Sequence, residues 1–173
     1  NQISPGLKWV STTEVTNNVY SVCVRYQFGR DSMPLEQEKC NDGNNNNVLG
    51  GRFNSYLNYG IIKGEQWLCQ KGQDNMDPSK YPYGGDHFVK LCPLWQLLLY
   101  YREIVGGEKR DWYGDVAEIV RNTDESQLTN GQLQLNFMRN TMDVVKEDLT
   151  DFFIKAGMLK PIDKELDDYA RGQ

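Results

Sequence analysis

The hydrophobic positions of this chain recur mainly at helical spacing. Apolar residues three and four apart predict a first helix from about Thr12 to Phe28, which Gly29 is expected to end. A second helix is predicted from about Arg52 to Ile62. A third covers the run from Phe88 to Val105, which is apolar on nearly all sides, as in the centre of a bundle. Pro93 is expected to start or kink this third helix.

The second half of the chain continues the helical pattern. The stretch "DWYGDVAEIVRN" predicts a shorter helix capped by Asp111, with one apolar side made of Trp112, Val116, Ile119 and Val120. A longer helix of roughly five turns, ended by Gly157, is predicted from the spacing of Met138, Met142, Val145, Leu149, Phe152 and Ala156. A short terminal helix is expected at or just after Pro161. No alternating strand pattern is present, so the predicted class is mainly α: a single bundle-like domain over residues 1–173 with long irregular loops.

Two polar segments interrupt the helices and predict surface loops. They are "EKCNDGNNNNVLGG" and "KGQDNMDPSKYPYGGD", whose Asn, Gly, Pro and Asp content cannot supply buried area. Tyr81 and Tyr83 in the second loop are the candidates for stacking on a sugar. The tryptophans Trp67, Trp95 and Trp112 are interpreted as packing residues of the core.

Charge and composition exclude some functions. The net charge of the 173 residues is -5, which argues against a general nucleic-acid or anionic-membrane binder because phosphates are usually met by a basic face. The chain has no apolar run near the roughly 18 residues that a membrane span needs. It begins without an initiator Met, so we expect a fragment of a larger protein.

The four cysteines contain no C-x-x-C pair, which argues against a structural zinc knuckle. Cys40 and Cys69 lie in loop-like sequence and are the pair that an oxidising compartment would allow to bridge. Cys23 and Cys92 lie in apolar helical stretches, where we expect free, buried thiols.

Glu14 is the candidate for chemistry, in the stretch "STTEVTNNVYSVC". The local interpretation is a capping box, in which the Ser11 hydroxyl and the Glu14 carboxylate each satisfy a free backbone N–H group of the first turn. The longer stretch "WVSTTEVTNNVYSVCV" resembles a segment of the enhancin-like, mucin-degrading zinc metallopeptidases of the gluzincin type. "LWQLLLYY" (Leu94 to Tyr101) and "DLTDFFIKAGML" (Asp148 to Leu159) resemble the same family, in the same order along the chain.

This resemblance implies that Glu14 is the third zinc ligand of a catalytic site. In the family, an H-E-x-x-H helix supplies two histidine ligands and the general base, and a glutamate on a following helix completes the site. The chain has one histidine, His87, and no H-E-x-x-H, so the resemblance implies that this segment lies upstream in the same polypeptide. Asn17 and Asn18 are candidates for orienting the carboxylate, and His87 is a weaker candidate for stabilising an oxyanion.

By this resemblance, the parent protein is a secreted or bacterial surface endopeptidase whose substrates are mucin-type O-glycosylated proteins. The chain by itself is then expected to be inactive and to bind no zinc. The alternative is a helical recognition or packing module of a secreted glycoprotein- or glycan-binding protein, in which Glu14 only caps its helix. A third possibility is a degenerate family member that binds glycoprotein without cutting it.

Overall fold

A computed structural model of the chain describes residues 5–9, 12–29, 35, 40–41, 47–48, 51–64 and 87–159. The fold is mainly α. Its helices are η1 (Pro5–Leu7), α1 (Thr13–Gln27), α2 (Gly51–Ser55), η2 (Tyr56–Ile62), α3 (His87–Leu99), η4 (Tyr100–Val105), η5 (Gly107–Asp111), α4 (Trp112–Arg121), α5 (Asn130–Val145) and α6 (Thr150–Lys155). η1 and η5 are 3-10 helices, whereas η2 and η4 are π-helical continuations of α2 and α3. Two short strands, β1 (Cys40–Asn41) and β2 (Asn47–Val48), pair antiparallel with Cys40 opposite Val48.

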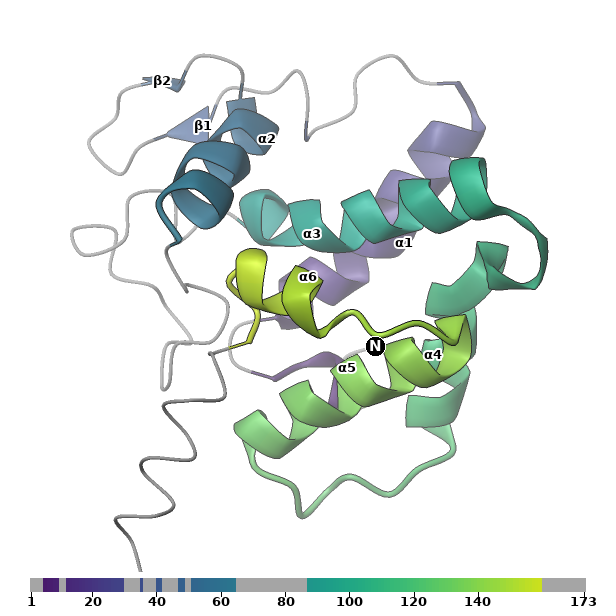
Figure 1. Ribbon diagram of the computed structural model, residues 1–173. Helices are drawn as coiled ribbons and strands as arrows, with labels where there is room; N and C mark the ends of the chain where they lie inside the picture. The colour runs from purple at the N-terminus through teal and green to yellow at the C-terminus, as the bar shows by residue number, and fades with distance from the viewer. Residues whose placement is uncertain are drawn as a thin grey trace, which may run out of the picture.

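The core forms where α1 lies against α3 and where α4 pairs with α5 (Figure 1). The α1 side of this core is the stripe of Val15, Val19 and Val22, each at most 1% exposed. Tyr26 of α1 packs edge-on against Trp95 of α3, with the ring centroids 5.4 Å apart. In Figure 1, α6 lies between α3 and α5, and Gln134 of α5 donates a hydrogen bond to the carbonyl of Met158 just after α6. The helices therefore share one hydrophobic core.

The structure confirms the first three predicted helices. α1 ends beside Gly29, which has a φ of 61°, the left-handed conformation that stops a helix. Pro93 lies inside α3 and not at its start, because the helix already begins at His87. Trp95 and Trp112 are buried as predicted, whereas Trp67 lies outside the described residues.

The predicted continuous helix from Met138 to Ala156 is wrong, because two helices occupy this stretch. α5 ends at Val145, and Lys146 takes a left-handed conformation with a φ of 57°. After the break, the Asp148 carboxylate accepts a hydrogen bond from the Thr150 backbone N–H at 2.9 Å, where α6 begins. Gly157, with a φ of 73°, follows the end of α6 as predicted. The helix predicted after Pro161 lies outside the described residues.

The predictions for α4 and for the cysteines are confirmed only in part. Asp111 does occupy the N-cap position of α4, but within the described part of the chain its side chain makes no capping hydrogen bond. Ile119 is 38% exposed, so the buried side of α4 consists of Trp112, Tyr113, Val116 and Val120. Cys92 is buried as predicted and Cys23 is half-buried, and neither forms a disulfide in the described part of the chain. Cys69 lies outside the described residues, so its pairing with Cys40 stays a prediction.

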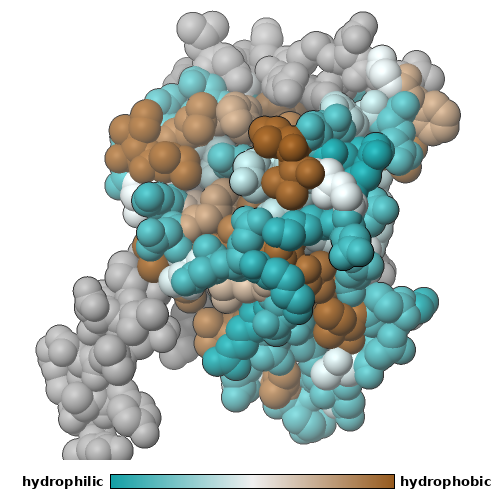
Figure 2. Space-filling model, turned by 45° about the vertical axis from the view of Figure 1, so that its right-hand side comes forward, coloured by the Kyte–Doolittle hydropathy of each residue, from teal (hydrophilic) through white to brown (hydrophobic). Residues whose placement is uncertain are grey.

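Some large apolar side chains remain on the surface. Phe28, Ile62 and Ile104 are between 74% and 76% exposed. On the face drawn in Figure 2, hydrophobic residues form separate groups interrupted by hydrophilic ones. None of the described helices combines the length and the apolar character that a membrane crossing needs.

Candidate functional site

Glu14 is the second residue of α1, in the first turn of a helix that is anchored in the core. Helical spacing places positions 14, 17, 18 and 21 on one face of α1. Asn17 and Asn18 are half-buried on this face, and Ser21 is exposed. The side chain of Glu14 itself lies outside what the structure describes.

The N-cap position of α1 falls on Thr12, one residue later than the capping box requires. Thr12 makes no side-chain capping hydrogen bond to the described first turn. Its hydroxyl instead donates to the carbonyl of Trp9, and its backbone N–H donates to the same carbonyl at 2.9 Å. Ser11 lies outside the described residues, so the capping box itself stays a hypothesis. The observed cap position does not favour it.

The segment before α1 is packed firmly against the second half of the chain. Trp9 is 1% exposed and lies on Phe137 of α5, with the ring centroids 4.8 Å apart. Tyr20 of α1 meets Tyr113 of α4 edge-on at 5.6 Å. Burial raises the pKa of the Tyr113 hydroxyl, which therefore stays protonated as a hydrogen-bond donor. Aromatic contacts thus join α1 to α4, and the segment before α1 to α5.

Asn18 has a defined local partner. The hydroxyl of Ser21 lies 3.1 Å from the Asn18 carbonyl and 3.3 Å from its side-chain Oδ1. The second contact holds the Asn18 side-chain oxygen close to Ser21 on the helix face that includes position 14.

The side chains of the other predicted site residues lie outside what the structure describes. His87 is the first residue of α3, and its side chain lies outside what is described. Tyr81 and Tyr83 lie outside the described residues altogether. Among the residues that are described, no group of three His, Cys, Asp or Glu side chains is close enough to hold a metal ion.

An apolar groove is a feature that sequence reasoning missed. It has a volume of about 540 Å³ and lies between α3, η4, α2 and α6, with an apolar lining that includes Phe53, Trp95, Leu99, Leu149 and Phe152. Three residues of its lining recur four apart along α3 and η4, namely Gln96, Tyr100 and Ile104. Tyr100 is 42% exposed and Ile104 is 75% exposed. The sequence signal for the groove was therefore this spacing of an aromatic and an apolar residue on the exposed side of a helix.

Glu147 provides a charged group at the lining of the groove. Lys109 Nζ lies 2.6 Å from Glu147 Oε1, and the Tyr101 hydroxyl donates to Oε2 at 3.1 Å. The hydrogen bonds from Lys109 and Tyr101 lower the pKa of the Glu147 carboxyl, so it is ionised at neutral pH. The groove can therefore take up an apolar group that carries a hydrogen-bond donor at one end.

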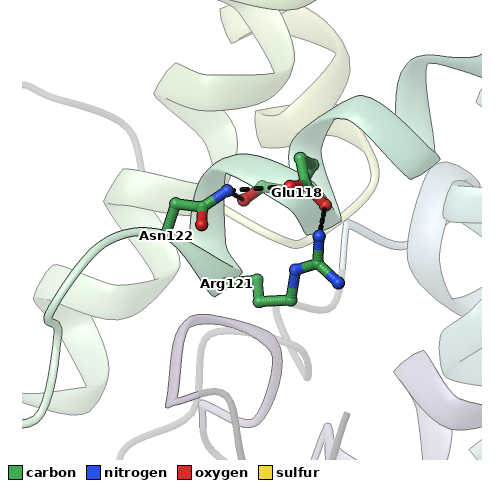
Figure 3. A network of polar contacts seen from close by, with 3 residues as sticks. All are labelled: Glu118, Arg121 and Asn122. Carbon is green, nitrogen blue, oxygen red and sulfur yellow. Dashed lines mark hydrogen bonds and ion pairs between the residues drawn. The ribbon is translucent and has the colours of Figure 1, made fainter.

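A second charged cluster, formed by Glu118, Arg121 and Asn122, lies on the protein surface. On α4, Arg121 and Asn122 both contact the carboxylate of Glu118 (Figure 3). Hydrogen bonds from Arg121 and Asn122 lower the pKa of the Glu118 carboxyl, and the bond from Arg121 has the larger effect. All three side chains are exposed and lie within one helical turn, so we assign this cluster to the solvated face of α4.

The chain matches the sequence model of a known protein family. Residues 1–157 match the sequence model of the family described as Peptidase M60, enhancin and enhancin-like. No curated protein matches the chain. The matched range contains α1 with Glu14, the groove and every helix described above.

Proposed function

Since the chain belongs to the Peptidase M60 family of enhancin and enhancin-like proteins, we propose that it forms part of a zinc endopeptidase site and that Glu14 is the third metal ligand. The observation that carries this proposal is the position of Glu14 within the matched range, in the first turn of a helix whose other face is buried. A ligand on an anchored helix needs little reorganisation to meet a metal.

The residues present fit one part of such a site. A carboxylate oxygen is an ordinary zinc ligand, and catalytic zinc commonly has two histidines and one carboxylate, with a fourth position left for water. The sequence contains one histidine, so the two imidazole ligands and the general base would come from an H-E-x-x-H segment outside these 173 residues. Zinc, when bound, would make its water acidic enough to attack a peptide carbonyl at neutral pH.

The chain's own residues would hold and orient the Glu14 carboxylate. Asn17 and Asn18 lie on the same face of α1 and can donate hydrogen bonds to it or to a neighbouring loop. The chain by itself would be inactive, because a single protein ligand does not hold a catalytic zinc.

The wider assignment follows from the family and is likewise a proposal. Residues 1–173 would be the helical C-terminal portion of the catalytic domain, packed against the segment that carries the two histidines. The substrates would be mucin-type O-glycosylated proteins, and the protein would be secreted or displayed on a bacterial surface.

The proposal predicts that Glu14→Gln removes zinc from a polypeptide that contains this chain together with an H-E-x-x-H segment. The carboxamide keeps the size of the side chain but loses the negative charge that binds the metal. Elemental analysis should find about one zinc per chain in the unchanged protein and a small fraction of that in the variant.

The matched control is Glu118→Gln, which changes an exposed carboxylate on α4 and should leave the zinc content unchanged. Equal zinc in the Glu14→Gln variant and in the control would show that Glu14 is not a ligand.

The groove beside α3 supports a second candidate, a recognition module without catalysis. Its apolar lining and the oriented Glu147 carboxylate are features of a binding surface that need no metal. The zinc measurement separates the two candidates, because a recognition module would contain no zinc either before or after the Glu14 substitution. A degenerate family member would be recognised by binding of glycoprotein without cleavage.

A further inference from the structure

Among the described side chains, the N-cap residue Thr12 does not cap the first turn of α1. The first four N–H groups of a helix have no partner within the helix, and uncapped first turns fray. Thr12 at the N-cap directs its hydroxyl backward to Trp9 and makes no capping bond to the described turn. The backbone at Glu14, two positions later, is therefore not held by a cap from Thr12.

Two hydrogen bonds to carbonyl groups connect the start of α1 to other parts of the chain. The hydroxyl of Thr16, a residue with no exposed surface, donates to the carbonyl of Leu7 in η1 at 2.5 Å. The hydroxyl of Tyr113 in α4 lies 3.3 Å from the carbonyl of Thr16 and donates to it. One bond ties the turn to the segment before it, and the other ties it to a helix 97 residues further along the chain.

The residues that these bonds reach are themselves fixed. Leu7 is 1% exposed, and η1 packs against α4 and α5. Tyr113 is 3% exposed and lies beside Trp112 and Phe137 in the same core. The first turn of α1 is thus connected to the core by two hydrogen bonds from buried hydroxyls, at 2.5 Å and 3.3 Å.

We propose that Thr16 and Tyr113 are positioning residues for the metal ligand: they form a clamp that fixes the backbone of the first turn of α1 and so the direction from which Glu14 reaches zinc. This proposal rests on the proposed function, in which Glu14 is that ligand. Neither hydroxyl touches the metal, and the clamp acts only through the backbone that carries Glu14. A ligand held in place loses little freedom when the metal binds, whereas a ligand on a fraying turn must be ordered first.

The test uses a polypeptide that contains this chain and the H-E-x-x-H segment, and it measures zinc affinity separately from stability. The variants Thr16→Val and Tyr113→Phe each remove one hydroxyl and keep the shape of the side chain. The zinc dissociation constant, measured by competition with a chromogenic chelator, should rise about tenfold in each. Thr16→Ser keeps the hydroxyl and should bind zinc within about twofold of the unchanged protein.

Matched controls remove the hydroxyls of buried residues whose hydrogen-bond partners lie outside α1. Thr141→Val loses a bond from the Thr141 hydroxyl to the Phe137 carbonyl at 2.8 Å, and Tyr56→Phe loses one to Gln96 at 3.1 Å. Both should lower the unfolding temperature of the zinc-free protein by about the same few degrees as the clamp variants, without weakening zinc binding. Equal weakening in the controls, or unchanged affinity in Thr16→Val and Tyr113→Phe, would overturn the positioning role.

Glu14→Gln serves as the reference in the same experiment. If that variant binds zinc as tightly as the unchanged protein, Glu14 is not a ligand, and the proposed function fails together with the clamp. If Glu14→Gln loses zinc while both clamp variants keep it, only the clamp fails. Should Thr16→Val not fold, Tyr113→Phe still decides, because it removes a single hydroxyl and leaves the α1 sequence unchanged.

Discussion

Replacing Gly6 by Ala is expected to lower the free energy of unfolding by about 2–3 kcal/mol. A Cβ atom at this position would lie 2.0 Å from Oε2 of Glu125 and 2.8 Å from a methyl group of Val120. Glu125 is 2% exposed and is held through its other oxygen by the amide of Asn136 at 3.2 Å. Moving its carboxyl group aside would strain or break that bond, and the added methyl group would still press on the buried Val120.

The measurement is the urea-induced unfolding of the Gly6→Ala variant against the unchanged chain. Gly114→Ala is the matched control, because a Cβ there meets nothing within 4 Å inside α4. It should raise stability by about 0.5–1 kcal/mol, the usual gain of Ala over Gly in a helix.

A double variant localises the cause. If the clash with the Glu125 carboxylate causes the loss of stability, Gly6→Ala should lower the free energy of unfolding by less in a Glu125→Ala background. There only the Val120 contact remains. A Gly6→Ala variant as stable as the unchanged chain would show that the carboxyl group can leave this position freely.

Periodicity predicted most helices because their apolar residues are the core residues. Val15, Val19 and Val22 recur at helical spacing and are buried, so the pattern and the packing agree in α1. The break between α5 and α6 had no such signal. Lys146 is neither Gly nor Asn, and its left-handed backbone is followed by Glu147, whose partners Lys109 and Tyr101 come from another part of the chain. The residues around Lys146 therefore could not reveal these contacts, and the helix break was not predicted.

The candidate site was predictable only in part. Family resemblance predicts Glu14 as a metal ligand, whereas local reasoning favours a capping box with Ser11, and the role of Glu14 stays a prediction. The Tyr113 contact to Thr16 joins residues 97 positions apart, and the groove is formed by helices from both halves of the chain. Such features arise from tertiary packing, so a pattern read along one segment cannot predict them.

Replacing Lys90 by Met is expected to raise the free energy of unfolding at pH 7 by as much as about 3 kcal/mol. Lys90 is 4% exposed in the first turns of α3, between the buried residues Val89 and Leu91. Burial lowers the pKa of its ammonium group to about 8, from an ordinary value of 10.5. Below pH 8 the group is charged in both states, and the folded state carries the full cost of burying that charge.

The sign of the pH dependence follows from this lowered pKa. Between about pH 8 and 10.5 the folded protein releases the Lys90 proton while the unfolded chain retains it, so the stability of the unchanged protein rises with pH. Methionine carries no charge, so the advantage of the variant should be largest below pH 8 and should decline steadily above it. Burial also raises the pKa of Tyr56 and Tyr113, which destabilises both proteins alike at higher pH and cancels in the comparison.

Chemical denaturation of the two proteins from pH 6.5 to 9.5 measures this difference directly. Lys155→Met, which removes an exposed lysine at the end of α6, is the matched control and should change stability by no more than about 0.5 kcal/mol. A Lys90→Met advantage that stays constant across this range would mean that the gain comes from better packing and not from removing a buried charge. A less stable variant at pH 7 would show that the ammonium group makes a favourable contact that outweighs its burial.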